Sequence, residues 1–400
     1  MLKDEFFRVI SSNELNYYDI DLNDEIAKFD DETIKRTIIR YFETGGKREL
    51  VSFKNIQFLP EMRWSHSFSL FLLGNIVGKT KIGQESIIER ILSQFNFLPG
   101  FNESRFVFYW FLCVLFHDAG YSISQEYRNR EINLNWLRVS CHVNHSLYGK
   151  SVRIYPFNTS SDYHPLSIRW ANHKVSSSPK CRYVDRGIAF PYKFCSIIEN
   201  NKSVVTDYFD AFRNHDNPSY RELNHGIIGG EMFFSILCDE YARNFKEVHI
   251  KDETAKFDRF DYGMLNWQIQ LLDVYRIIGD VIISHSMWRI PSYDNVNMYI
   301  EKGLDRLPRY GQRLSMRNPL LFLLCFVDTI DPIKYFKKHT DLSTKSILDL
   351  VDIHVLGNSI KIRSNEIEYL NYLKDGNLDT WMNVQVSEVI DNMIAIQILE

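Results

Sequence analysis

The sequence lacks three features that would place it in a class at once: paired cysteines, a long apolar run and a strong excess of charge of one sign. Its six cysteines include no C-x-x-C pair, which argues against a disulfide framework and favours reduced thiols in the cytosol. No apolar stretch reaches the roughly 18 residues that a membrane span requires. Residues 1–5 carry charge where a signal peptide needs apolar residues. We therefore expect a cytoplasmic protein without a membrane partner.

The charge balance limits the partners that the chain can hold. Its formal net charge is −4, so no global field would attract a nucleic acid, and any polyanion would need a local basic patch. Hydrophobic residues make up 45% and charged residues 24% of the 400 positions, a composition that is typical of a folded chain with a sizeable core. The length suits two or three domains, or one large helical domain with insertions.

Changes in pattern along the chain predict three parts. Residues 1–60 have helical apolar spacing that ends at a glycine pair, and we expect a helical leader that packs on the core. Residues 61–335 hold the apolar helices and are interrupted at about 121–223 by a basic insertion rich in Ser, Asn, His and Pro. The insertion could cover a substrate, because long loops are often functional, or it could be a solvated surface excursion.

Residues 336–400 predict a small α/β appendage. Two alternating segments between Ile353 and Arg363 flank Gly357-Asn358, which is a hairpin signal. Residues 378–400 could add a helix and a last strand. Such an appendage serves packing, oligomerisation or contact with a partner.

A histidine and an aspartate, His117 and Asp118, stand side by side after a wholly apolar run at residues 106–116. We expect a buried helix over about 105–116, with the doublet in its terminal turn and Gly120 as a left-handed C-cap. An uncompensated carboxylate at the end of such a helix costs several kcal/mol, so a bound cation is the obvious compensation.

Four further groups are attached to apolar helices. Ser65 or Ser67 could cap a helix near whose start His66 lies, although a single histidine there is more often a hydrogen-bonded core residue than a ligand. His225 follows a cap at Asn224, and Gly229 four residues later permits close approach of a neighbouring helix or ligand.

The other two groups stand near helix ends. His285 ends an apolar helix over 265–288. Asp328 lies inside a helix that begins with a capping Asn318 and Pro319 and stops before Pro332. The carboxylate of Asp328 must be protonated, paired or bound to a cation, because the helix around it is apolar. Asp331, next to Pro332, is interpreted as a helix-end residue.

Other polar residues allow more than one role. Cys141, His142 and His145 resemble half of a zinc site without a matching second pair, because Cys181 and His173 are irregularly spaced. The histidines of the insertion could instead supply a proton or bind a phosphate; they are His142, His145, His164 and His173. An arginine-bearing loop could meet phosphate oxygens or be solvated; its residues include Arg306, Arg309, Arg313 and Arg317.

Taken together, the helix-attached groups form an ordered set of imidazoles and carboxylates. In chain order they are His66, His117, Asp118, His225, His285 and Asp328. Imidazole and carboxylate together suit divalent metal ions, and we expect one or two ions among Mn, Fe, Co, Ni, Zn and Mg.

This ordered set resembles the HD superfamily of metal-dependent phosphohydrolases. Three local strings carry the likeness: Arg63-x-x-His66-Ser67, Leu115-Phe116-His117-Asp118-Ala119-Gly120 and Ile283-Ser284-His285-Ser286. The resemblance covers residues 62–332 and leaves the insertion unmatched. Many members continue the doublet with Gly-Lys or Gly-His, whereas this chain has Gly120-Tyr121.

The resemblance implies a mostly α fold with an HD-type helical core, carrying the insertion and the appendage. It implies that the first metal is bound by His66, His117, Asp118 and Asp328. It also implies that His225 and His285 bind a second metal or contact the phosphate, and that Asp118, His225 and His285 carry the catalysis. Residues expected at the substrate phosphate are Arg63, Arg306, Arg309 and Arg313.

The function expected on this basis is hydrolysis of a nucleotide phosphoester by metal-activated water, by a phosphohydrolase or phosphodiesterase. Two alternatives stay open: a metal-dependent nuclease acting on single-stranded nucleic acid, and a non-catalytic HD-fold sensor or scaffold. The sequence also leaves open whether the protein forms a homo-oligomer.

Overall fold

The structure is a computed structural model that describes residues 64–94, 103–121, 198–199, 202–203, 225–226, 229–230, 233, 278–279, 281–282, 284–286 and 313–399. Residue contacts divide the chain into two compact units. Unit 1 comprises residues 1–47, 60–115 and 311–400, and unit 2 comprises 48–59 and 116–310. The predicted leader and almost all of the insertion lie outside the described residues. The HD-type fold class and the three-part division stay predictions.

Two apolar helices of unit 1 pack closely together. Helix α3 (Trp64–Val77) is buried along nearly its whole length, and α5 spans Glu103–Phe116. A Cβ atom on Gly74 would lie 2.2 Å from the Trp110 ring, so glycine is required where the helices meet. The Trp110 indole N–H donates to the Phe71 carbonyl at 3.2 Å, which satisfies a buried polar group.

The start of α3 corrects one prediction. Because Trp64 is already helical, Ser65 and Ser67 lie inside the first turn, and the expectation that one of them caps the helix is wrong. Both side chains are buried, and Ser65 accepts a hydrogen bond from the Thr344 hydroxyl at 3.2 Å.

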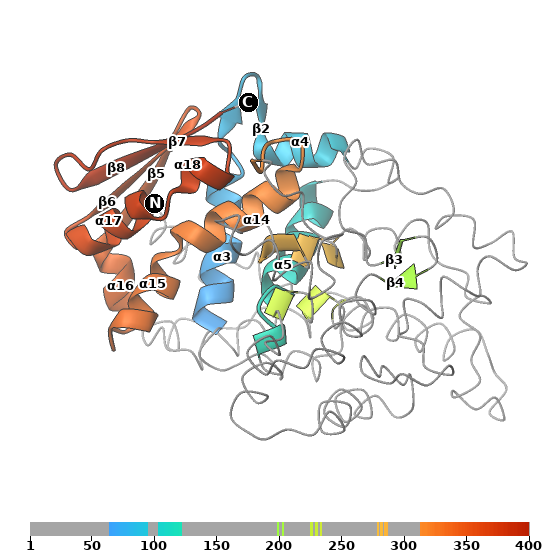
Figure 1. Ribbon diagram of the computed structural model, residues 1–400, viewed down its shortest axis with the longest axis horizontal. Helices are drawn as coiled ribbons and strands as arrows, with labels where there is room; N and C mark the ends of the chain where they lie inside the picture. Colours follow the sequence, from blue (N-terminus) through green and yellow to red (C-terminus); the bar gives the residue numbers. More distant parts are fainter. Residues whose placement is uncertain are drawn as a thin grey trace, which may run out of the picture. The chain divides into compact units, whose positions relative to one another are not determined.

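Helix α14 (Pro319–Ile330) packs against α3 and α4, and Figure 1 shows it beside α3. Its predicted bounds are confirmed: it begins at Pro319 and ends before Pro332. Asn318 occupies the N-cap position, but its side chain makes no capping hydrogen bond, so that part of the prediction is wrong. Helix α15 (Pro332–His339) follows at once, and Asp331 caps it by accepting from the Ile333 and Lys334 backbone N–H groups.

A hairpin and a short helix connect α3 to α5. Strands β1 (Lys81–Ile82) and β2 (Glu85–Ser86) are antiparallel, and Gly83 between them has φ +67°, which glycine adopts without strain. Helix α4 (Ile87–Gln94) then begins with a capping box. The Ser86 hydroxyl accepts from the Glu89 N–H at 3.1 Å, and the Glu89 carboxylate accepts from the Ser86 N–H at 2.6 Å.

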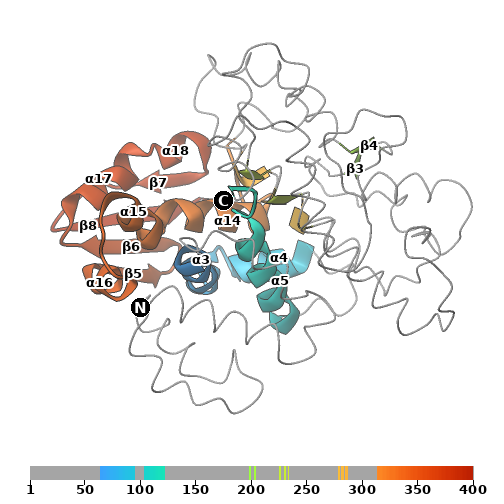
Figure 2. The same ribbon diagram turned by 90° about the horizontal axis from the view of Figure 1, so that it is seen from below.

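A four-stranded antiparallel sheet of order β5-β6-β8-β7 dominates the end of the chain. Its strands are β5 (Val351–Leu356), β6 (Ser359–Ser364), β7 (Val384–Val386) and β8 (Met393–Ile398). The hairpin prediction is confirmed, because Gly357-Asn358 joins β5 to β6 and Gly357 has φ +63°. Its accompanying helices are α16 (Thr344–Leu350), α17 (Ile367–Asp375) and α18 (Leu378–Trp381); Figure 2 shows them in a second view.

The sheet buries one face and exposes the other. In the paired strands β5 and β6, Ile353 and Ile362 are fully buried opposite each other, whereas the next pair, His354 and Lys361, points away from the core. The phenol of Tyr369 on α17 donates to the Ile330 carbonyl at the end of α14, at 2.6 Å. Helix α17 is therefore anchored directly to the end of α14.

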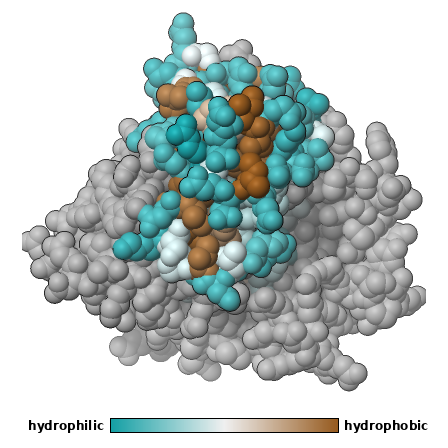
Figure 3. Space-filling model, turned by 90° about the vertical axis from the view of Figure 1, so that its left-hand side faces the viewer, coloured by the Kyte–Doolittle hydropathy of each residue, from teal (hydrophilic) through white to brown (hydrophobic). Residues whose placement is uncertain are grey.

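Polar side chains cover most of the face of this part that Figure 3 presents. Figure 3 shows narrow apolar strips between polar side chains on the face that it presents. Cys113 and Cys325 are buried free thiols, which confirms the expectation for these two cysteines. No helix among the described residues is long and apolar enough to cross a membrane.

Candidate metal centre

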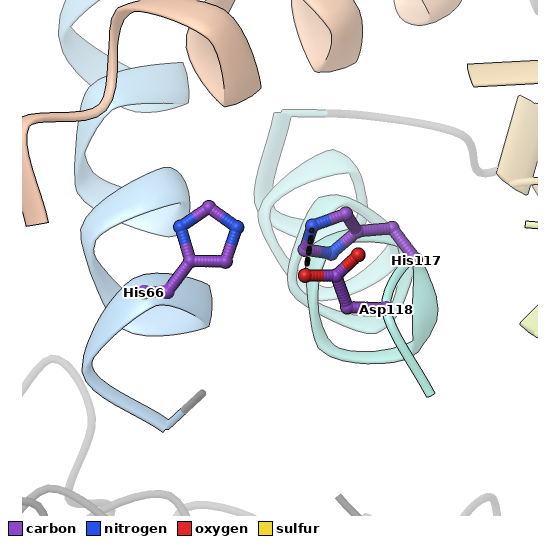
Figure 4. A group of neighbouring side chains, drawn as sticks. All are labelled: His66, His117 and Asp118. Atoms are coloured by element: carbon purple, nitrogen blue, oxygen red, sulfur yellow. Dashed lines mark ion pairs between the residues drawn. The ribbon is translucent and has the colours of Figure 1, made fainter. Parts of the chain in front are cut away.

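The His117-Asp118 doublet lies in a turn that directly follows α5. The Ala119 N–H donates to the Phe116 carbonyl at 3.0 Å, and the Tyr121 N–H donates to the Asp118 carbonyl at 3.0 Å. Both members of the doublet are buried, and His117 Nε2 lies 3.5 Å from Asp118 Oδ2; Figure 4 draws this pair. The predicted position at the terminal turn is confirmed, and the turn directs two consecutive side chains toward each other.

Glycines allow other segments of unit 2 to approach the doublet. A Cβ atom on Gly120 would lie 2.0 Å from the His225 carbonyl oxygen, and one on Gly229 would lie 2.8 Å from the Phe116 carbonyl oxygen. Among the described glycines only Gly83 and Gly357 have positive φ. The left-handed C-cap predicted at Gly120 is therefore wrong, and close packing explains this glycine. The close approach predicted at Gly229 is confirmed.

His225 and His285 converge on Asp118 within unit 2. His225 Nε2 lies 3.5 Å from Asp118 Oδ1 and 3.3 Å from His285 Nε2. One ligand atom from each of the three residues lies within 4.8 Å of the others. The His117 and His285 rings meet edge to face, with centroids 5.3 Å apart. Four of the six predicted ligands therefore form one cluster, which we call the Asp118 cluster: His117, Asp118, His225 and His285.

Two contacts orient the imidazoles of the Asp118 cluster. His285 Nδ1 lies 2.5 Å from the Ile282 carbonyl oxygen; a carbonyl only accepts, so the proton of the neutral ring is on Nδ1 and Nε2 is left to bind a cation. Tyr121 stacks on His225 with ring centroids 3.9 Å apart and an interplanar angle of 14°. Sequence reasoning did not identify this contact of Tyr121 with His225.

The spacing of the Asp118 cluster fits a divalent cation. Bonds of about 2.1 Å to a tetrahedral ion place adjacent ligand atoms about 3.4 Å apart, and the measured separations at His225 Nε2 are 3.3 and 3.5 Å. His117, Asp118 and His285 are buried and His225 is mostly buried. A cation would offset the charge of the buried carboxylate.

His66 forms a second group, in unit 1. Its Nδ1 lies 2.7 Å from Asp331 Oδ2, and its Nε2 lies 3.2 Å from Asp328 Oδ1; Figure 4 draws the ring on α3. Burial alone would lower the pKa of His66, but the hydrogen bonds and negative charges of Asp328 and Asp331 outweigh burial and raise this pKa from 6.5 to about 9.

Asp328 is paired, which is one of the three states expected for it. Its Oδ1 also lies 2.6 Å from Lys334 Nζ, and its side chain is 16% exposed, so the apolar helix does not enclose it completely. Asp331 is 1% exposed, and the contact that it makes with His66 was missed. A second carboxylate three residues after Asp328, at a helix junction, was the available signal.

The remaining candidates are placed as follows. Arg313 is exposed in unit 1. The other candidates lie outside the described residues; they are Arg63, Arg306, Arg309, Cys141, His142, His145, His164 and His173. His66 and Asp328 belong to unit 1 and the Asp118 cluster belongs to unit 2, so a single site built from all six ligands stays a prediction.

In comparisons with known proteins, no family model, curated protein or solved structure matches the chain.

Proposed function

We propose that the protein is a metal-dependent phosphohydrolase or phosphodiesterase that hydrolyses a nucleotide phosphoester with metal-activated water. The observation that carries the proposal is the convergence of Asp118, His225 and His285 in a mostly buried group with the spacing of cation ligands. The order of these residues along the chain resembles the order of the metal ligands in the HD superfamily. This resemblance suggests the class of reaction, the hydrolysis of a phosphoester.

A structural alternative is that the same residues only satisfy one another by hydrogen bonds. Hydrogen bonds between nitrogen and oxygen centre on about 2.9–3.0 Å, whereas the separations between the side chains of the Asp118 cluster are 3.3 Å for His225–His285 and 3.5 Å for His225–Asp118 and His117–Asp118. These separations are long for hydrogen bonds between buried groups and suit ligands of a common ion, which favours the metal site.

The residues of the Asp118 cluster have distinct roles in the proposed reaction. A bound divalent cation supplies Lewis acidity that lowers the pKa of water toward about 7. Asp118 offers Oδ2 toward His117 and Oδ1 toward His225, so one carboxylate links two imidazoles and can accept a proton from the attacking water. The Ile282 carbonyl fixes the His285 ring, and the Tyr121 ring covers one face of His225.

The test combines metal analysis with a phosphoester screen. Protein purified without chelators is expected to contain a first-row divalent metal, and with manganese to hydrolyse a nucleoside triphosphate, a cyclic nucleotide or a simple phosphodiester. The double variant His117→Ala, Asp118→Ala is expected to lose more than about 100-fold in turnover, because even supporting residues of metal sites cost 10- to 100-fold. The control His354→Ala changes an exposed histidine on β5 and should retain activity.

Three other outcomes would count against the proposal or favour an alternative function. Full activity in the double variant would refute the proposal. Cleavage of single-stranded DNA, with binding that falls steeply as salt is added, would indicate the nuclease. Bound metal without turnover of any phosphoester would support the sensor or scaffold.

A further inference from the structure

We infer that Asp331 is a positioning residue: it holds His66 so that Nε2 of the ring and Oδ1 of Asp328 face each other as a pair of cation ligands. The inference rests on the metal dependence in the proposed function, and it assigns a role to a residue outside the expected ligand set. It depends only on contacts inside unit 1.

Asp331 is a carboxylate fully supplied with hydrogen-bond donors. Its Oδ2 accepts from His66 Nδ1 at 2.7 Å and from the Lys334 N–H at 2.8 Å. Its Oδ1 accepts from the Ser69 hydroxyl at 2.5 Å and from the Ile333 N–H at 3.3 Å. All four partners are hydrogen-bond donors, so the Asp331 carboxylate, which is 1% exposed, is the acceptor in each contact.

A hydrogen-bond acceptor at one nitrogen of an imidazole determines which nitrogen is available to bind a metal ion. Because Asp331 holds a proton on His66 Nδ1, the proton that a metal ion would displace is the one on Nε2, and the lone pair that this leaves faces Asp328. Nε2 and Asp328 Oδ1 are 3.2 Å apart, and ligands on bonds of about 2.1 Å lie about 3.0–3.4 Å apart in octahedral and tetrahedral sites. The pair therefore has the separation of adjacent ligands.

The plainer interpretation is that Asp331 only caps α15. A cap needs an acceptor for the backbone N–H groups of Ile333 and Lys334, and serine is as good a cap as aspartate. A serine at position 331 is too short to reach His66 Nδ1. The variant Asp331→Ser therefore keeps the cap and removes the contact with the ring, which separates the two interpretations.

The experiment measures Mn²⁺ affinity of the full chain by titration calorimetry. His66→Ala first identifies the binding event that uses His66. For that event, Asp331→Ser is expected to weaken Mn²⁺ binding by about 10- to 100-fold, the usual effect of a residue that orients a metal ligand. The matched control is Ser343→Ala, which removes the N-cap of α16 and should leave the Mn²⁺ affinity unchanged.

A second variant covers the case in which Asp331→Ser does not fold. Asp331→Asn keeps an oxygen that can accept from Nδ1, so its affinity should lie between those of the wild type and His66→Ala. Wild-type affinity in both Asp331 variants, or no Mn²⁺ binding by the wild type, would overturn the inference. Weakened Mn²⁺ binding without turnover in any variant, the wild type included, would leave this inference in place and refute the phosphohydrolase.

Discussion

Raising the pH should destabilise the metal-free protein through His66. Asp328 and Asp331 raise the pKa of this buried ring from 6.5 to about 9, even though burial lowers it. At about 1.4 kcal/mol per pKa unit, the shift corresponds to about 3 kcal/mol of unfolding free energy. Because the folded-state pKa is the higher one, this stabilisation is fully present below pH 6.5 and is lost as the pH rises to about 9.

The assay compares the wild type with His66→Gln in chelator, by urea unfolding at several pH values. The difference in unfolding free energy between the two proteins should shrink by about 3 kcal/mol between pH 6 and pH 10. His354→Gln, which changes an exposed histidine paired with Asp352, serves as the control. An NMR titration that places the pKa of His66 at or below 6.5 would refute the reasoning, because burial would then outweigh the carboxylates.

Three further outcomes follow from the structure. Gly120→Ala should destabilise the fold by more than Gly357→Ala does, and it should also weaken metal binding. The new Cβ at position 120 would lie 2.0 Å from the His225 carbonyl oxygen, whereas position 357 has open space and only an unfavourable φ of +63°. Thermal melts and metal titrations of the two variants test this expectation. Tyr369→Phe should lower the unfolding free energy by about 1–2 kcal/mol, since it leaves the buried Ile330 carbonyl without its donor; urea unfolding measures this, and an unchanged midpoint would contradict it. Adding a chelator to metal-loaded protein should lower the melting temperature, because the free energy that metal binding adds to folding is lost, about 2.7 kcal/mol when the free metal was at 100 times Kd; a melting temperature independent of metal would contradict it.

Strong local signals made part of the fold predictable from the sequence. The apolar run before His117 predicted α5, and Pro319 and Pro332 bracketed α14 correctly. Gly357 marked the turn of the β5–β6 hairpin. Each of these signals acts within a few residues, so no tertiary contact was needed to interpret it. The clustering of Asp118 with His225 and His285 was anticipated because all of them were attached to apolar helices.

Other features depend on contacts between distant parts of the chain. Gly120 was interpreted by its usual role as a helix cap, whereas packing against the His225 carbonyl requires it. Asp331 accepts from His66, 265 positions away, and a helix-end signal cannot reveal that contact. Helix α4 was predictable in principle, because Ser86 and Glu89 have the spacing of a capping box. The Tyr121 stack on His225 had no local signal.

The ion pair between Lys334 and Asp328 has a consequence for the metal-free state of the protein. The ammonium lies 2.6 Å from the same Oδ1 atom that faces His66. This carboxylate therefore carries a tethered counter-ion, and an arriving metal would exchange with a positive charge already there. The junction between α14 and α15 would then remain electrically neutralised in both states, so that gain and loss of metal can be reversible without unfolding.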